Sequence, residues 1–171
     1  MTRRLAWLVA ALTACSAPRA ESAPDTAAVS LAVGDAPKPL TLRTLAGDTV
    51  TLGGAAPVTL VNVWATWCTS CREEMADLEA LHKELSPHGL RVVAVSIDEG
   101  DGRRVRRFVE RERLTFAVAR DSALRVQRAY GVVGVPESYV LGRDGTLTWH
   151  RTGGIHGGTR EAREAVLRAL E

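Results

Sequence analysis

The sequence predicts an α/β fold in which a central mixed β-sheet is flanked by helices and preceded by a β-hairpin. Two observations support this prediction. Two apolar runs rich in β-branched residues enclose a segment of helical periodicity, as in a βαβ unit with parallel strands. A hairpin pattern precedes this unit, and an antiparallel hairpin and a closing helix follow it. The 171 residues, 46% hydrophobic and 25% charged, suffice for one domain with a real core and a short leader.

The first elements are a hairpin and a buried strand. Residues Leu40–Leu45 alternate between apolar and polar, Gly47-Asp48 turns the chain, and Thr49–Leu52 forms the returning strand. The apolar run Val58–Trp64 then predicts a strand that is covered on both faces.

A helix and a second buried strand complete the βαβ unit. The helix is predicted by apolar residues that recur at helical spacing, namely Met75, Leu78, Leu81 and Leu85. It is expected to end before Pro87, and the second strand is predicted over Arg91–Ile97.

The same two periodicities predict the remaining elements. The helix Arg103–Arg113 is expected to turn Val105, Phe108 and Val109 inward and its arginines to solvent. The later elements are a strand at Phe116–Val118, a helix at Ser122–Tyr130, strands at Ser138–Leu141 and Thr146–Trp149 joined by the turn Arg143-Asp144-Gly145, and a helix from about Thr159 to Leu170.

The pattern with the most chemical information is Trp67-Cys68-Thr69-Ser70-Cys71, between the first buried strand and its helix. Unpaired N–H groups and the dipole at a helix N-terminus favour an anion, so Cys68 is expected partly as the thiolate that attacks disulfides. The i, i+3 spacing places Cys71 one turn further on the same face, close enough to close a ring with Cys68. These features predict a redox-active pair.

The first fourteen residues have the pattern of a signal peptide. Met1–Arg4 is basic, and the apolar run Leu5–Leu12 is too short to span a bilayer comfortably. Leu12-Thr13-Ala14-Cys15 resembles the bacterial lipoprotein box, in which cleavage precedes the cysteine and its thiol carries a diacylglycerol. The alternative is an ordinary secretory leader with a chance cysteine. Lipidation of Cys15 would leave a single cysteine pair and no spare thiol.

The domain boundaries and charge follow from this reading. We assign residues 1–14 to a lipoprotein-type signal peptide, 15–30 to a flexible tether rich in Ala, Ser, Pro and Asp, and 31–171 to the folded domain. Arg3 and Arg4 supply the whole net charge of +2, and without them the basic residues equal the 20 acidic ones. A neutral domain gives no reason to expect nucleic acid as a partner.

Two segments, Val61–Met75 and Tyr130–Val140, carry a resemblance to a known family. The sequence is similar to the thioredoxin superfamily, in particular to its membrane-tethered thiol–disulfide oxidoreductases of the TlpA, ResA and CcmG (DsbE) type. The resemblance extends from Leu31 to the C-terminus and includes, as a weaker feature, a helical insert between Ile97 and Phe116. It implies a thioredoxin-like fold.

The resemblance also implies roles for the site residues. Cys68 would attack a substrate disulfide and Cys71 would resolve the mixed disulfide. The Val135–Pro136 bond would be cis and would present backbone groups to an extended substrate strand. Trp67 would flank the exposed sulfur as part of the substrate surface, whereas Trp64 is expected in the core. Glu137 would shape the substrate groove; the alternative is a surface charge at the start of a strand.

The source of the proton for Cys71 is a further question. Thioredoxin itself has an acid six positions before the first cysteine, where this chain has Asn62. Glu74 matches an acidic position of the ResA and CcmG group and would share a helix face with Cys71, where it could hold or accept the proton. The alternative is a solvated glutamate that only favours the helix dipole.

The resemblance implies partners and a location as well. The protein is expected to be a monomer outside the cytoplasmic membrane, facing the periplasm, attached by a lipid and reduced by a membrane donor of the DsbD or CcdA kind. Its substrates would be exported proteins with disulfides, and apocytochrome c is one candidate. No metal or organic cofactor is expected, because the four histidines, His82, His88, His150 and His156, lack zinc-ligand spacing. His82 is expected to be exposed.

Two alternatives come from other functional classes. A peroxiredoxin-like peroxidase would place its cysteine in a Pro-x-x-x-Thr-x-x-Cys pattern, but here Thr66 stands at the wrong spacing and Val63 does not match that proline. Peroxide consumption by the purified domain would favour it. A copper-binding assembly factor of the SCO type would use two cysteines separated by three residues and a distal histidine, whereas only two residues separate Cys68 from Cys71. Stoichiometric retention of Cu(I) would favour that class.

Overall fold

The computed structural model describes residues 31–155 and 159–171. The predicted signal peptide (residues 1–14), the tether (15–30) and the lipidation site Cys15 lie outside the described residues. Within the described ranges, every helix is too short or too polar to traverse a bilayer.

A five-stranded mixed sheet forms the centre of the domain, in the order β5-β4-β3-β6-β7. Its strands are β3 (Val58–Trp64), β4 (Leu90–Ser96), β5 (Ala117–Arg120), β6 (Glu137–Leu141) and β7 (Leu147–Thr152). Strands β3, β4 and β5 are parallel, whereas β6 pairs antiparallel with both β3 and β7. The predicted βαβ unit and the predicted C-terminal hairpin are both confirmed.

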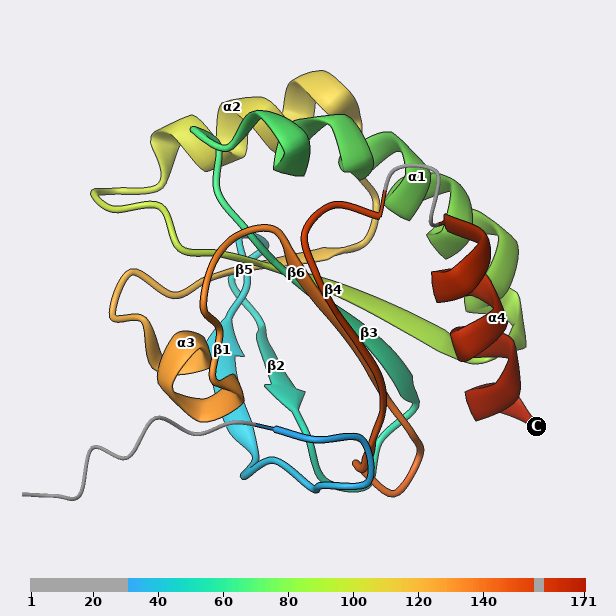
Figure 1. Ribbon diagram of the computed structural model, residues 1–171. Helices are drawn as coiled ribbons and strands as arrows, with labels where there is room; N and C mark the ends of the chain where they lie inside the picture. Colours follow the sequence, from blue (N-terminus) through green and yellow to red (C-terminus); the bar gives the residue numbers. More distant parts are fainter. Residues whose placement is uncertain (1–30, 156–158) are drawn as a thin grey trace, which may run out of the picture.

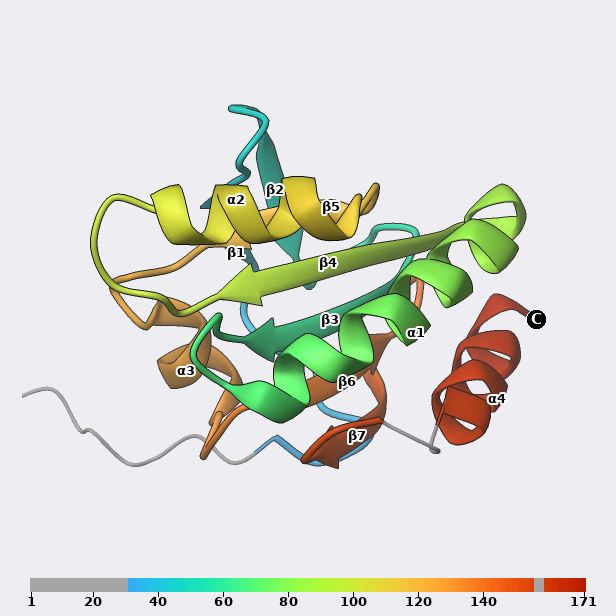
Figure 2. The same ribbon diagram turned by 90° about the horizontal axis from the view of Figure 1, so that it is seen from above.

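Helices cover both faces of this sheet (Figures 1 and 2). They are α1 (Thr69–Leu85), continued by the 3-10 turn η1 (Ser86–His88), then α2 (Arg103–Glu112), α3 (Arg125–Tyr130) and α4 (Thr159–Leu170). One apolar cluster joins the sheet to α1, α2 and α4, and a second joins it to α3 and the N-terminal hairpin. Strand β3 contributes Leu60 and Trp64 to the first and Val61 and Val63 to the second, which explains its unbroken apolar run.

The N-terminal hairpin, β1 (Leu40–Arg43) and β2 (Thr49–Leu52), covers the edge of the sheet. Thr44 forms a bridge to Ala119, and the Leu45 amide donates to the Val118 carbonyl at 2.8 Å. These contacts occupy backbone groups of β5 that would otherwise form an open strand edge.

Helix α3 begins three residues later than its apolar pattern predicts. Leu124 has a φ of 55°, in the left-handed region, so the regular helix starts at Arg125. The buried Asp121 carboxylate accepts the Val126 amide at 2.6 Å and satisfies one free N–H of the first turn. The turn before the helix is therefore stabilised by a side chain, which apolar periodicity does not register.

Candidate functional site

Cys68 and Cys71 form a disulfide where β3 leads into α1, with their Cα atoms 5.3 Å apart. Cys68 is the N-cap of the helix, and its Sγ accepts the Cys71 amide at 3.2 Å. Cys68 is 8% exposed, whereas Cys71 is fully buried. Of the two sulfurs, that of Cys68 is therefore the one that a large partner can reach.

The loop before β6 lies against the exposed side of the disulfide. The Val135–Pro136 bond is cis, as the resemblance implied, and the Val135 carbonyl oxygen lies 3.6 Å from the Cys68 Sγ. Trp67 is 61% exposed and Val133 is 80% exposed. An exposed aromatic side chain therefore directly precedes Cys68 in the chain, while Trp64 is fully buried, as predicted.

The segment that carries Trp67 into the helix is held by Asp98, just beyond the end of β4. The buried Asp98 carboxylate accepts the Thr66 amide at 2.8 Å, the Thr66 hydroxyl, and the Ser96 hydroxyl at 2.9 Å. Bonds from neutral donors to a carboxylate are roughly twice as strong as those between neutral groups. Asp98 therefore fixes the backbone two residues before Cys68.

Glu74 lies inside the protein, so the solvated alternative is wrong. Its side chain is fully buried on α1, one turn beyond Cys71. Oε1 accepts the Asn62 side-chain amide at 2.7 Å, and Oε2 accepts the Ile155 backbone amide at 2.8 Å. A buried carboxylate placed one helical turn from the second cysteine has the chemistry for proton exchange with it.

Glu137 is also buried, so the alternative of a surface charge is wrong as well. It follows the cis-proline, and its carboxylate accepts the Val133 amide at 3.1 Å and the Thr152 hydroxyl at 3.3 Å. Its Oε1 lies 2.6 Å from Nε2 of His150, whose side chain is 31% exposed. Glu137 thus connects the loop carrying Val133 to strand β7. It can shape the predicted substrate groove only indirectly, through the position of this loop.

Of the four histidines, His156 lies outside the described residues. Among the described residues, no group of three or more His, Cys, Asp or Glu side chains is placed to hold a metal ion. His82, expected to be exposed, is instead half-buried, with its ring edge-on to Phe116 at 6.0 Å.

Sequence reasoning missed Asp98, Ser138 and His150 as neighbours of the site. Ser138 lies beside Asn62, whose side-chain amide donates to its hydroxyl at 3.0 Å. The position of Asp98 at the carboxyl end of a parallel strand was the one available signal, because ligands and functional groups gather at that end in α/β sheets. No local pattern pointed to Ser138 or His150.

Sequence comparison identifies relatives of this chain. The AhpC/TSA family profile matches residues 33–150. The thioredoxin-like protein YneN of Bacillus subtilis is 34% identical over 139 residues, 80% of this chain and 78% of that protein. The thiol–disulfide oxidoreductase ResA of Halalkalibacterium halodurans is 34% identical over 95 residues, 56% of this chain. The chain spans about half the length of the ResA relatives it matches, 53% in that case.

Structural comparison agrees with the sequence relationship. A Chlorobium tepidum protein assigned as the thiol:disulfide interchange protein DsbE superposes with a TM-score of 0.76 at 27% identity, over 83% of this chain and the whole of the other. StoA from Bacillus subtilis shares the fold, with a TM-score of 0.66 at 20% identity over 75% of this chain and 96% of that one. The chain therefore belongs to the AhpC/TSA family of thioredoxin-like proteins, among which it is similar to proteins of the ResA and DsbE type.

Proposed function

We propose that this protein is an extracytoplasmic thiol–disulfide oxidoreductase that reduces disulfides of exported proteins through Cys68 and Cys71. One observation carries the proposal: the two cysteines form a disulfide at the start of α1, one sulfur reachable and the other buried. The names of the ResA and DsbE relatives agree with this chemistry.

The reaction begins with the reduced pair. The Cys68 thiolate, stabilised by the Cys71 amide and the helix dipole, attacks one sulfur of the substrate disulfide, and the other substrate sulfur leaves as a thiolate. Cys71 then loses its proton and attacks the Cys68 sulfur of the mixed disulfide. The substrate's second thiolate leaves, so the substrate gains two electrons and the Cys68–Cys71 disulfide forms.

The substrate would lie along the cis-proline loop. The Val135 backbone stands 3.6 Å from the attacking sulfur, so an extended substrate strand pairing there would bring its own sulfur to Cys68. Trp67 and Val133 would cover the apolar side chains next to the substrate disulfide.

The cellular setting is also part of the proposal. The leader ending at Cys15 supports a lipid-anchored protein outside the cytoplasmic membrane. A reductase in an oxidising compartment needs a supply of electrons, so a membrane donor of the DsbD or CcdA kind would reduce the pair again. The haem-attachment cysteines of apocytochrome c are one candidate substrate.

The test uses the full chain and two cysteine variants. The wild type should reduce insulin disulfides with dithiothreitol as electron donor, Cys68→Ser should be inactive, and Cys71→Ser should accumulate mixed disulfides that reducing agents release. Full turnover by Cys71→Ser would refute the assigned roles. Peroxide consumption or stoichiometric Cu(I) retention by the wild type would favour the peroxidase or the copper-binding class instead.

A further inference from the structure

We propose that the pocket beside Trp67 binds an acidic segment of the substrate protein close to its disulfide, and that Arg104 and Arg107 pair with the carboxylates of that segment. The proposal rests on the function proposed above and adds a substrate class to it. It assigns specificity to a surface of this chain that takes no part in the thiol chemistry.

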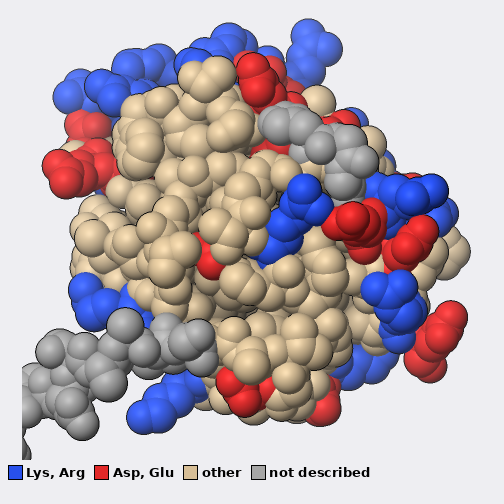
Figure 3. Space-filling model, viewed as in Figure 1, with Lys and Arg blue, Asp and Glu red and all other residues tan. Residues whose placement is uncertain are grey.

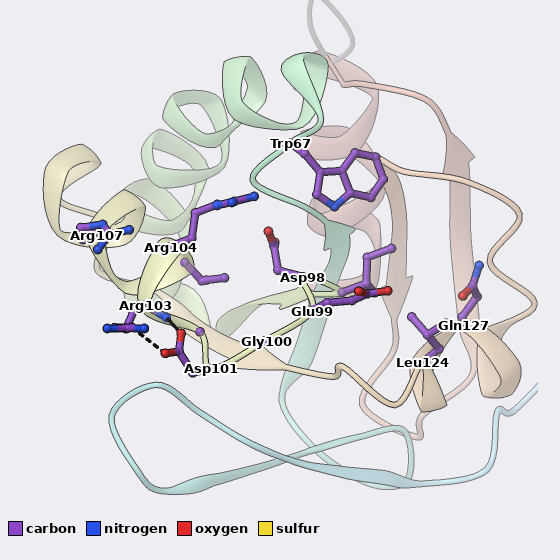
Figure 4. Close-up of a pocket in the computed structure, with 13 residues that line it drawn as sticks. Trp67, Asp98, Glu99, Gly100, Asp101, Arg103, Arg104, Arg107, Leu124 and Gln127 are labelled. Atoms are coloured by element: carbon purple, nitrogen blue, oxygen red, sulfur yellow. Dashed lines mark hydrogen bonds and ion pairs between the residues drawn. The ribbon is translucent and has the colours of Figure 1, made fainter.

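The pocket opens next to the redox-active pair. It has a volume of about 1050 Å³ and is lined by Trp67, by the segment Ile97–Gly102 after β4, and by residues at the starts of α2 and α3 (Figure 4). Trp67 lines the pocket and is also the immediate chain neighbour of Cys68, so the pocket lies beside the place where the substrate must dock. A substrate whose sulfur reaches Cys68 can therefore place an adjacent segment in this pocket.

The positive charge of the pocket that has no partner among the described residues lies on α2. Arg103 is held by Asp101 at 2.5 Å, whereas Arg104 and Arg107 form no hydrogen bond or ion pair with a described residue. Basic side chains gather on the surface over α2 (Figure 3). Because a guanidinium offers several donors in a planar fork, these two arginines are suited to bind carboxylates.

The acidic groups of the pocket do not cancel this charge at α2. The Asp98 carboxylate is buried and accepts hydrogen bonds from Thr66 and Ser96, and Asp101 is paired with Arg103. Glu99 points toward Leu124 and Gln127, across the pocket from the arginines (Figure 4). The pocket is therefore polarised, and the two arginines that pair with no described residue lie on its α2 side.

Apolar side chains complete the pocket. Trp67 is 61% exposed and Leu124 is 37% exposed, two of the few large apolar side chains that the described residues leave open to solvent. Exposed apolar groups beside unpaired arginines match the composition of a protein-binding surface, in which aromatic residues and arginine are enriched. The favoured occupant is a peptide segment with Asp or Glu next to an apolar residue.

The test compares two disulfide peptides that differ only in charge, one with Asp and Glu beside its disulfide and one with Ser and Gln at those positions. For Arg104→Gln/Arg107→Gln, KM for the acidic peptide should rise by roughly three- to thirtyfold, as expected for two partly exposed ion pairs. Turnover of the neutral peptide and of a small aromatic disulfide should change less than about twofold, because neither depends on these pairs.

The control is Arg143→Gln/Arg168→Gln, which removes the same charge at the other end of the sheet. Arg143 and Leu170, the end of α4, both lie near Gly89 before the start of β4, away from the disulfide. This variant should keep the wild-type preference for the acidic peptide over the neutral one. If KM in Arg104→Gln/Arg107→Gln changed equally for both peptides, or did not change, the proposal would be overturned. Arginine-dependent binding to phosphatidylglycerol vesicles, without any preference between the peptides, would overturn it as well.

A binding measurement separates the two proposals. The acidic peptide, with its cysteines alkylated and a fluorescent label, is titrated with the protein and followed by anisotropy. If the wild type reduced no disulfide, the proposed function would fail. The titration would still test whether the pocket binds the acidic peptide. Tighter binding of the acidic than of the neutral peptide, lost in Arg104→Gln/Arg107→Gln, supports the site; equal binding refutes it.

Discussion

The side-chain amide of Asn62 donates a 2.7 Å hydrogen bond to the buried carboxylate of Glu74, beneath the redox-active disulfide. The second carboxylate oxygen accepts the Ile155 amide at 2.8 Å, and Asn62 also donates to Ser138. Four segments therefore meet around one ionisable group, namely strand β3, helix α1, strand β6 and the segment before α4. The network fixes this buried carboxylate one helical turn from Cys71, and we propose that it exchanges a proton with that thiol.

We expect Glu74→Gln to slow the resolving step. In the proposed role Glu74 accepts the proton of Cys71, so its loss should lower the rate at neutral pH by roughly a hundredfold, the low end of general-base effects. The pH dependence of mixed-disulfide resolution, measured by rapid quench, should also change its midpoint. Glu73→Gln is the matched control, because Glu73 is exposed on the same turn. A wild-type pH profile in Glu74→Gln would show that Glu74 is only structural.

Asp98→Ala should destabilise the segment that leads into the disulfide. The change leaves the buried Thr66 amide without its acceptor, so we expect a loss of about 1–3 kcal/mol in the free energy of unfolding. Urea denaturation measures this loss, and Glu99→Ala, at the exposed next position, should stay within about 0.5 kcal/mol of the wild type. Equal stabilities of the two variants would mean that Asp98 does not stabilise the segment that contains Thr66.

Glu137→Ala should loosen the loop that carries Val133 and Val135. The variant removes the acceptor shared by the Val133 amide, the Thr152 hydroxyl and His150. We expect KM for a protein substrate to rise several-fold, while the alkylation rate of reduced Cys68 stays within about twofold, since the sulfur keeps its helix N-terminus. Slower alkylation with an unchanged KM would contradict this assignment.

The buried Glu79 carboxylate should make part of the stability pH-dependent. Burial acts to raise the pKa of Glu79, but hydrogen bonds from the Thr115 amide and hydroxyl and from Lys83 outweigh it and lower the pKa below its usual range. The folded protein therefore releases the proton more readily than the unfolded chain. The resulting stabilisation is complete above about pH 4.3, the ordinary pKa of a glutamate, and is lost as the pH falls through the lowered value.

Glu79→Gln tests this dependence. The variant should be less stable than the wild type at pH 7 by about 1.5–3 kcal/mol, the range for hydrogen bonds to a charged group. The difference should shrink as the pH falls below about 4, because the wild type then loses its own carboxylate contribution. Urea denaturation at several pH values measures it. A constant difference across that range would show that ionisation of Glu79 does not stabilise the fold.

Periodicity and spacing along the chain determined the secondary structure and the cysteine pair. The apolar run of β3, the helical repeat after Cys71 and the i, i+3 placement of the two cysteines are local features, so the sequence alone predicted the mixed sheet and the position of the pair. The start of α3 was predicted less well, because the side chain of Asp121 stabilises a turn there that periodicity does not register.

Tertiary structure alone decided the surroundings of the pair. Asp98 reaches Thr66 across 32 positions, Glu74 reaches Ile155 across 81, and Glu137 meets His150 on a neighbouring strand. No periodic pattern encodes such contacts, because they form only when separate elements pack against one another. For the same reason, the sequence left open whether Glu74 and Glu137 were solvated or buried, since the burial of a charged side chain depends on what covers it.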